Sequence, residues 1–333
     1  MKAYILDAYG KSNMLRLGEM PEPAVGPDDV LIDIHAAGLN MIDSKIRSGE
    51  FKLLLPYKPP FVLGADLAGV VSRVGANVTR FAVGDAVYAS PRQGRIGTFA
   101  EAIAVDQADV GHKPANISME EAASIPLVGL TAWQVLVDRA QATRGQKVLI
   151  HAGSGGVGTF AIQLAKHLGL YVATTAGTSN VDLVRSLGAD EVVDYRKQDF
   201  ADILSGYDIV LNSLDGKTLA KSLKVLKPGA SLISISGPPD PAFARQQGLA
   251  WPLRQVMRLL SAGIRRKARR QDASYSFLFM QANGEQLDQI TTLIEAGAIR
   301  PVIDRVFPFD QLNDALAHLE TGRAKGKIVV SIR

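Results

Sequence analysis

The residues best suited to chemistry form a glycine-rich turn at 151–158, which reads His-Ala-Gly-Ser-Gly-Gly-Val-Gly. The turn follows an apolar run at 148–150 and opens a helix-compatible segment at 157–168. In such a strand–turn–helix unit the glycines allow a tight turn, close approach of a pyrophosphate, and packing of the helix on its strand. Free N–H groups at the helix start then bind the phosphates. We therefore expect a dinucleotide site that includes Gly153, Ser154, Gly155, Gly156, Val157 and Gly158.

The end of the next apolar strand, 171–175, indicates which dinucleotide is bound. An Asp or Glu there would meet the adenosine ribose and select NAD, but no acid precedes Asp182. A carboxylate about 5 Å from the 2′-phosphate would weaken the binding of NADP(H) by roughly 3 kcal/mol through charge repulsion. The absence of an acid therefore favours NADP(H). The residues expected to meet the phosphate are Ala176, Gly177, Thr178, Ser179 and Asn180. This loop holds no Arg or Lys, and Tyr195, Arg196 or a C-terminal arginine could substitute.

Composition limits the remaining classes of function. The chain has 333 residues, 47% hydrophobic and 21% charged, which excludes disorder and predicts two domains. It has no cysteine, which excludes disulfides, thiolate zinc sites, iron–sulfur clusters and cysteine nucleophiles. The five histidines form no H-E-x-x-H pair, so we expect no metal site. Without a secretory segment or an apolar run of about 18 residues, the protein is expected to be soluble and, in a bacterium, cytoplasmic.

The pattern along the chain predicts an α/β protein. Residues 1–120 have the short apolar runs and frequent turns of a β-barrel, with strands at 30–35 and 64–74. Ser118 is expected to cap a helix. From 146 to 237, apolar strands alternate with helices, which predicts a doubly wound parallel sheet. The expected elements are strands at 148–150, 171–175, 192–193, 209–211 and 232–235, and helices at 157–168, 181–187 and 218–226.

The C-terminal third departs from this alternation. Residues 251–270 are compatible with one basic helix. The last sixty residues are predicted to hold one helix, 285–296, and strands at 302–303 and 327–332. The predicted domains are therefore a catalytic domain at 1–120, an NADP(H)-binding domain at 121–265 and a return to the catalytic domain at 266–333.

Four segments resemble the medium-chain dehydrogenase/reductase superfamily, which pairs a GroES-like barrel with a Rossmann domain. The segments lie at 38–43, 63–71, 129–133 and 322–330. Asn40 and Ala65 stand where zinc alcohol dehydrogenases carry zinc ligands, and the four-cysteine lobe is absent. The chain therefore resembles the zinc-free quinone oxidoreductase branch. Within that branch, segment 274–280 is most similar to NADPH-dependent alkenal or enone reductases and their bacterial relatives.

The resemblance implies further contacts with the cofactor. Thr131 should approach the nicotinamide carboxamide, and Tyr195 and Arg323 should contact the 2′-phosphate. Lys327, in the closing motif, is counted with this set. The strand ends expected to line the cofactor are Asn212, Ser213, Leu214, Ser236 and Gly237, and the residues expected to border the nicotinamide are Phe277, Leu278 and Phe279.

Without a metal, an aldehyde carbonyl lacks its usual polarising group, whereas a conjugated acceptor spreads the charge of hydride addition onto its own oxygen. Asn40 could hydrogen-bond that oxygen, and Asp43, Lys45 and Tyr57 are further catalytic candidates. Asn40 fits a structural role in a turn as well as a catalytic one, and Asp43, Lys45 and Tyr57 fit structural, surface or packing roles better than catalytic ones. His151 is interpreted as a strand-end residue with satisfied hydrogen bonds.

The predicted function is therefore an NADPH-dependent, zinc-independent reductase of quinones or of the C=C bond of α,β-unsaturated carbonyls. A metal-free NADP-dependent alcohol or ketone dehydrogenase and a low-turnover NADPH-binding sensor or structural protein remain alternatives. The expected partner is a small-molecule quinone or enone, with no nucleic acid and no stable membrane insertion. A homodimer paired along strand 232–236 is left open. Residues 241–271 carry eight Arg or Lys and no acid, which we interpret as a solvated helix face.

Overall fold

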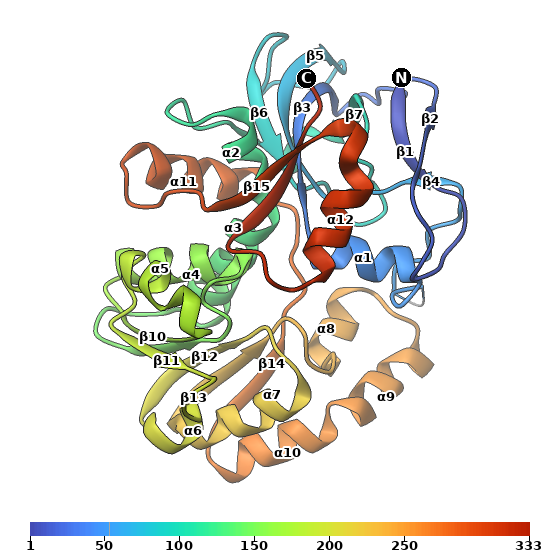
Figure 1. Ribbon diagram of the computed structural model, residues 1–333. Helices are drawn as coiled ribbons and strands as arrows, with labels where there is room; N and C mark the ends of the chain where they lie inside the picture. Colours follow the sequence, from blue (N-terminus) through green and yellow to red (C-terminus); the bar gives the residue numbers. More distant parts are fainter. Residues whose placement is uncertain (53) are drawn as a thin grey trace. The chain divides into compact units, whose positions relative to one another are not determined.

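The computed structural model describes residues 1–52 and 54–333 and divides into two compact units. The first unit comprises residues 1–130 and 281–333, and the second comprises residues 131–280 (Figure 1). The α/β class expected from the sequence is confirmed. The units divide at 130 and 280, whereas the sequence placed the boundaries at 120 and 265.

The first unit is built mainly from β-strands. One sheet runs β15-β16-β3-β5-β6-β8 with β7 also paired to β3, and a second sheet runs β2-β1-β4. Strand β16 pairs antiparallel with β3, so the last residues of the chain complete the sheet begun near its start. The strands are β1 Lys2–Leu6, β2 Arg16–Glu19, β3 Asp29–Leu39, β4 Phe61–Val62, β5 Asp66–Val74, β6 Ala86–Ala89, β7 Ala102–Asp106, β8 Val110–His112, β15 Ile303–Pro308 and β16 Lys327–Ser331.

The first unit also contains helices, of which α1 and α12 were not predicted from the sequence. They are α1 Met41–Ser48, α2 Met119–Ala123, α3 Pro126–Trp133, which crosses the boundary between units, α11 Gly284–Glu295 and α12 Leu312–Glu320. Ser118 caps α2 as expected, because its Oγ accepts from the Glu121 N–H while the Glu121 carboxylate accepts from the Ser118 N–H. The prediction of a single helix in the last sixty residues was wrong. Helix α12 buries only Leu312, Ala315 and Leu316. Three apolar positions within nine residues are too few to establish a helical period from the sequence.

The second unit holds a six-stranded parallel sheet in the order β11-β10-β9-β12-β13-β14. The strands are β9 Lys147–Ile150, β10 Tyr171–Ala176, β11 Glu191–Asp194, β12 Tyr207–Asn212, β13 Leu226–Ser234 and β14 Ser274–Phe277. The helices are α4 Gly156–His167, α5 Val181–Ser186, α6 Phe200–Ile203, α7 Gly216–Ser222, α8 Pro241–Gln246, α9 Trp251–Leu260 and α10 Ala262–Arg270, with a π-helix at Gln134–Arg139. Strand order reverses at β9, where ligands of such sheets bind at the carboxyl ends.

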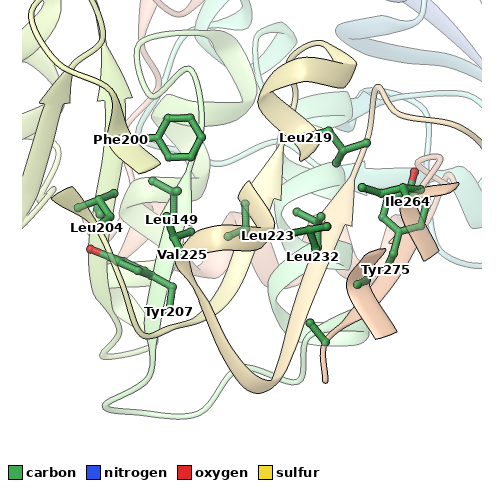
Figure 2. Packing of buried hydrophobic residues seen from close by; sticks show 14 of the residues in the cluster. Leu149, Phe200, Leu204, Tyr207, Leu219, Leu223, Val225, Leu232, Ile264 and Tyr275 are labelled. Carbon is green, nitrogen blue, oxygen red and sulfur yellow. The ribbon is translucent and has the colours of Figure 1, made fainter. Parts of the chain in front are cut away.

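Apolar side chains from both the strands and the covering helices form the core of this unit (Figure 2). Leu149, Val210 and Leu232 contribute from three neighbouring strands. Helix α10 covers the β14 side through Ile264 and Ala268, four residues apart on one helical face. Burial on both sides explains why the central strands read as continuous apolar runs.

Strand β14 changes two expectations. It pairs in parallel with β13 from Ser231↔Ser274 to Ser234↔Phe277, so strand 232–236 is not the edge on which a dimer could form. It also extends the second unit beyond residue 265. Asp240 fixes this part of the fold, because its two carboxylate oxygens accept from the N–H groups of Phe243 and Phe277.

The helix predicted at 251–270 is interrupted. Ser261 separates α9 from α10, and its buried Oγ donates to the Met257 carbonyl at 2.8 Å. On either side of this interruption the two helices have different partners. Helix α10 packs on β14, whereas α9 contacts α8.

Candidate active site

The glycine turn joins β9 to α4, as the sequence predicted. A Cβ on Gly153 would lie 2.1 Å from Thr174 Oγ1, and a Cβ on Gly158 would lie 2.3 Å from the Ala152 carbonyl oxygen. Both distances are well inside contact, so the fold itself requires glycine at these two positions. Ala152 has a φ of 52°, in the left-handed region, which tightens the turn before the helix.

Gly155 differs from its two neighbours in the motif. Its φ is −83°, which any residue adopts, and a Cβ there would meet only the Ala152 carbonyl oxygen at 3.4 Å. The packing of the protein therefore gives no reason for glycine at this position. A ligand that needs close approach to the N-terminus of the 12-residue helix α4 does give one. This open cradle fits the pyrophosphate of a dinucleotide.

His151 precedes the turn and is structural. Its ring nitrogens lie 3.2 Å from Thr175 Oγ1 and 2.9 Å from Ser222 Oγ, and the side chain is buried. Burial lowers the pKa of His151 to about 4, so the ring is neutral at physiological pH. The interpretation of His151 as a strand-end residue with satisfied hydrogen bonds is confirmed.

The loop after β10 contacts the glycine turn. Asn180 Nδ2 donates to Ser154 Oγ at 3.0 Å, and Ser179 Oγ donates to Asn180 Oδ1 at 3.4 Å. Thr178 Oγ1 donates to the buried carboxylate of Asp194 at 2.7 Å. The polar residues expected at the adenosine end are therefore brought to one place, at the carboxyl ends of β9 and β10.

A cation lies beside this loop. A Cβ on Gly177 would stand 3.2 Å from the Tyr195 hydroxyl and 3.7 Å from Arg196 Nε, so both side chains reach the loop backbone. The Tyr195 N–H donates to the carbonyl of Ala176, which is itself buried. Arg196 thus supplies the positive charge that the loop sequence lacks, and it is exposed. The sequence named Arg196 only as a substitute.

The ends of β12 and β13 lie against each other. Ser236 Oγ donates to the Leu214 carbonyl at 2.6 Å, and the Gly237 N–H donates to Ser234 Oγ at 2.9 Å. Ser213 Oγ lies 3.4 Å from the carbonyl oxygen of His151, next to the glycine turn. These strand ends, predicted to line the cofactor, therefore converge in the second unit.

Asn212 carries an unusual feature at this edge. Its Oδ1 accepts from the Leu214 N–H at 2.6 Å, but its Nδ2 is buried without a hydrogen-bond partner. An unsatisfied buried donor costs about 1–3 kcal/mol, which a ligand acceptor would recover. Together with the cradle at Gly155, this orphaned donor shows that the residues present fit a dinucleotide.

The predicted nicotinamide-side residues also lie in the second unit. The ring of Phe277 is buried and meets Phe243 edge-on, with ring centroids 5.0 Å apart. The ring centroid of Phe279 lies 6.0 Å from that of Phe243. The Leu278 N–H donates to the Ser234 carbonyl. Thr131 is buried at the first position of this unit.

The catalytic candidate Asn40 belongs to a buried polar cluster in the first unit. Lys327 Nζ donates to the Leu39 carbonyl at 2.6 Å and to Asn40 Oδ1 at 2.6 Å. It also contacts Asp66 Oδ2 at 3.2 Å, which accepts from Asn40 Nδ2 at 2.9 Å. The other Asp66 oxygen accepts from the Leu127 N–H. Lys327, counted with the cofactor contacts on sequence, is buried and engaged in this cluster.

Asp43 adjoins the cluster. Its Oδ2 accepts from the Asn40 N–H at 2.8 Å, while its Oδ1 is buried without a partner. The side chain is completely inaccessible, and this burial raises the pKa of Asp43 to about 7, against the pull of the Asn40 N–H and the Lys327 charge. Asp43 therefore exchanges its proton in the neutral range.

The remaining candidates lie in different surroundings. Lys45 Nζ lies 5.8 Å from the centre of the Phe51 ring. The Tyr57 hydroxyl accepts from the Gly94 N–H at 3.1 Å, and the Tyr57 ring stacks on Phe61. Arg323 lies in the turn after α12, in the first unit, with its N–H donating to Thr321 Oγ1.

The residues of the cluster do not fit a zinc ion. Ala65 has no ligand atom, and the amide oxygen of Asn40 already accepts from the Lys327 ammonium. Across residues 1–52 and 54–333, no three His, Asp or Glu side chains gather as a metal site would require. The sequence missed Asp66, although a carboxylate inside the apolar run 63–71 is itself a signal of a paired buried charge.

Comparison with known proteins covers both units. The family described as alcohol dehydrogenase GroES-like domain matches residues 26–115, and the zinc-binding dehydrogenase family matches residues 187–330. The mitochondrial NAD(P)H oxidoreductase RTN4IP1 of Danio rerio is 35% identical, with 100% of this chain and 91% of that protein aligned. The chloroplastic NADPH-dependent alkenal/one oxidoreductase of Arabidopsis thaliana is 36% identical, with 99% of this chain and 79% of that protein aligned.

A solved structure is also similar to this chain over its whole length. The quinone oxidoreductase from Coxiella burnetii is similar with a TM-score of 0.85 and 31% sequence identity. The alignment covers 100% of this chain and 99% of that chain. The similarity therefore extends over both the β-rich unit and the parallel-sheet unit.

The difference between the glycines gives a first prediction. Gly155→Ala should leave the melting temperature unchanged but weaken the binding of NADPH, used as the probe, by about tenfold, roughly 1.4 kcal/mol. Gly158→Ala should lower the melting temperature, because its Cβ meets the backbone at Ala152. Thermal unfolding and fluorescence titration measure the two effects. Equal loss of stability in both variants would contradict the assignment of Gly155 to a ligand.

Asp43 gives a second prediction, on pH. A carboxyl whose pKa is raised in the folded state contributes stability that is present below the unfolded pKa and is lost as pH rises through the folded pKa. The unfolding free energy of the wild type, relative to Asp43→Asn, should therefore fall by up to about 4 kcal/mol between pH 4 and pH 7. Urea unfolding at a series of pH values measures it.

Asp215→Asn is the matched control for this experiment. Asp215 is an exposed helix cap whose pKa lies below the ordinary value because it accepts from the Thr218 N–H. Its substitution should leave the slope between pH 4 and pH 7 unchanged. A wild-type profile parallel to that of Asp43→Asn would show that Asp43 is ionised throughout.

Proposed function

The chain belongs to the medium-chain dehydrogenase/reductase superfamily, in its zinc-free quinone oxidoreductase and alkenal reductase branch, and we propose that it reduces quinones or the C=C bond of α,β-unsaturated carbonyls with NADPH. It is an oxidoreductase that uses NADP(H). The names of the relatives support the substrate class, which includes 2-methylene-furan-3-one for an enzyme of Solanum lycopersicum.

The cluster of Lys327, Asp66 and Asn40 is the observation that carries this proposal. In the region where zinc alcohol dehydrogenases carry ligands for a carbonyl-polarising cation, this chain places an internal ion pair bridged by an amide. A saturated aldehyde needs strong polarisation of its oxygen to accept a hydride, whereas a conjugated acceptor delocalises the charge itself. The donor set of this chain therefore suits conjugated acceptors.

Asn40 is the residue we assign to the acceptor oxygen. Its amide is held in one orientation, because Oδ1 accepts from Lys327 and Nδ2 donates to Asp66. An amide nitrogen has two hydrogens, so one remains available to a carbonyl or quinone oxygen. Asp43 Oδ2 accepts from the Asn40 N–H, and Asp43 Oδ1 has no partner. With its pKa of about 7, the Asp43 carboxyl is partly protonated at neutral pH. We assign Lys45 and Tyr57 no step, because they lie against aromatic rings and a loop.

The second unit holds the cofactor in this proposal. The N–H groups at the start of α4, beside Gly155, would hold the pyrophosphate, and Asn212 Nδ2 would donate to the cofactor. Arg196, Tyr195 and the hydroxyl-rich loop after β10 bind the 2′-phosphate. NADPH would supply the hydride when bound, and the residues of the chain would position the acceptor and exclude water.

A panel of acceptors tests the function. NADPH and NADH consumption are followed with one o-quinone, one 2-alkenal, one cyclic enone and one saturated aldehyde. Turnover with NADPH of the conjugated acceptors alone is the expected result. Turnover of the saturated aldehyde, or oxidation of an alcohol with NADP⁺, would instead establish the metal-free dehydrogenase. NADPH binding without turnover of any acceptor would establish the sensor or structural protein.

Arg196 gives a prediction on cofactor choice. Arg196→Gln should weaken NADPH binding by about tenfold or more and leave NADH binding unchanged, because only NADPH carries the 2′-phosphate. Lys197→Gln is the control, since Lys197 is paired with Asp194. Dissociation constants from fluorescence titration measure the effect. Equal weakening of both cofactors would place the 2′-phosphate elsewhere.

A further inference from the structure

Helix α9 carries more exposed large apolar side chains than any other element of the described chain. Trp251 is 70% exposed, Leu259 is 75% exposed and Leu260 is 59% exposed, with Val256 nearly half exposed. Val256, Leu259 and Leu260 are spaced i, i+3 and i+4, so they share one side of α9. Of the apolar face of α9, the fold buries only Met257. We call the exposed side chains of α9 and α10 the α9–α10 surface.

Positive charge surrounds these apolar groups. The cations of α9 and α10 are Arg254 and Arg265, which are half-buried, and Arg258, Arg266, Lys267, Arg269 and Arg270, which are exposed. Residues 241–271 contain no Asp or Glu. In the described parts of the chain, none of these seven cations takes part in an ion pair. Their charge is therefore not neutralised within the chain, although the rest of the sequence is mildly acidic.

The fold orients the cations of α10 outward. Ile264 and Ala268 are buried in the core of the second unit, and Ile264 lies beside Tyr275 (Figure 2). The side chains of Arg266, Lys267, Arg269 and Arg270 are exposed. Helix α9 follows α8 and leads directly into α10 along one side of the unit (Figure 1). The exposed apolar side chains of α9 are therefore followed directly along the chain by the exposed cations of α10.

We propose that the α9–α10 surface docks this protein on the surface of an anionic lipid bilayer. Exposed aliphatic and indole side chains of an amphipathic helix insert at the boundary between headgroups and acyl chains, and flanking cations bind lipid phosphates. The docking is peripheral, because no helix among the described residues has the length and apolar character to cross a bilayer. An acceptor dissolved in the membrane would then be close to the enzyme, a consequence that rests on the proposed function.

Charge complementarity favours a lipid surface over two other occupants. A second copy of the chain, related by a two-fold axis, would bring the same uncompensated cations toward one another. A nucleic acid would use aromatic side chains to stack on bases, but Trp251 is the only aromatic residue in α9 and α10, and the exposed aliphatic groups beside it match acyl chains. The sequence favoured a solvated face because it does not show that these apolar side chains are exposed.

Vesicle sedimentation tests the proposal with the full-length protein. The vesicles are phosphatidylcholine alone, or phosphatidylcholine with about one third phosphatidylglycerol, each at low and high salt. Binding to the anionic vesicles should be at least about tenfold stronger and should fall with salt. The double substitution Leu259→Gln/Leu260→Gln should reduce it by about tenfold or more, and Arg266→Gln/Arg269→Gln/Arg270→Gln by about a hundredfold.

Two matched controls carry the same chemical changes elsewhere. Met14→Gln/Val83→Gln removes exposed apolar groups from the first unit, and Lys58→Gln/Lys217→Gln/Lys224→Gln removes three exposed cations. Both should bind anionic vesicles like the wild type. All substituted positions of the α9–α10 surface are exposed, so a folded protein is expected, and thermal unfolding verifies it.

Four results would overturn the proposal. Equal binding to both kinds of vesicle, or no binding to either, would remove the lipid partner. Binding of duplex DNA that is as tight as vesicle binding and indifferent to the leucine substitutions would assign the surface to nucleic acid. A wild-type dimer in sedimentation velocity that the leucine substitutions convert to a monomer would assign it to self-association. The acceptor panel uses dispersed substrates without vesicles, so failure of docking and failure of the reductase function are distinguishable.

Discussion

The buried ion pair between Lys327 and Asp66 is the interaction on which the first unit depends. Lys327 opens β16, the last strand of the chain, and Asp66 opens β5, while the Leu39 carbonyl and Asn40 lie at the end of β3. One ammonium group therefore joins three strands that are far apart in sequence. Removing one partner of such a pair leaves the other buried and uncompensated, which typically costs about 3–5 kcal/mol. Together with the pairing of β16 with β3, this ion pair holds the C-terminal strand to the first unit.

The same interaction determines the chemistry available there. A neutral amide and an internally compensated charge pair replace ligands for a cation, so the unit offers oriented hydrogen bonds instead of strong polarisation. Asp43, adjoining this cluster, keeps an unusual proton affinity because it is fully buried. The residues proposed to bind the dinucleotide, from Gly155 to Arg196, belong to the second unit, whereas this cluster belongs to the first. Because the relatives align over both units, membership of the superfamily applies to the whole chain and not to one unit alone.

Much of the second unit could be predicted from the sequence because its signals are local. Each central strand is an apolar run covered on both faces, and the G-x-G-x-x-G spacing directly follows one of these runs. Strand β14 was missed because Ser274–Phe277 is short and half polar, and only its pairing with β13 makes it a strand. Helix α1 was missed as well. It depends on a cap at Asn40 and on Asp43, whose roles appear only when the cluster is assembled.

The polar cluster itself could not be predicted, for the same reason. Asn40, Asp66 and Lys327 are separated by 26 to 287 residues, and no sequence pattern links a carboxylate in one strand to a lysine in another. A double-mutant cycle of Lys327→Met and Asp66→Asn, read as the free energy of unfolding, tests the central claim most directly. Our account predicts that each single substitution destabilises the protein by several kcal/mol and that the double substitution costs clearly less than their sum, by about 1–3 kcal/mol. Additive effects within about 0.5 kcal/mol would contradict it, because the two charges would then contribute independently.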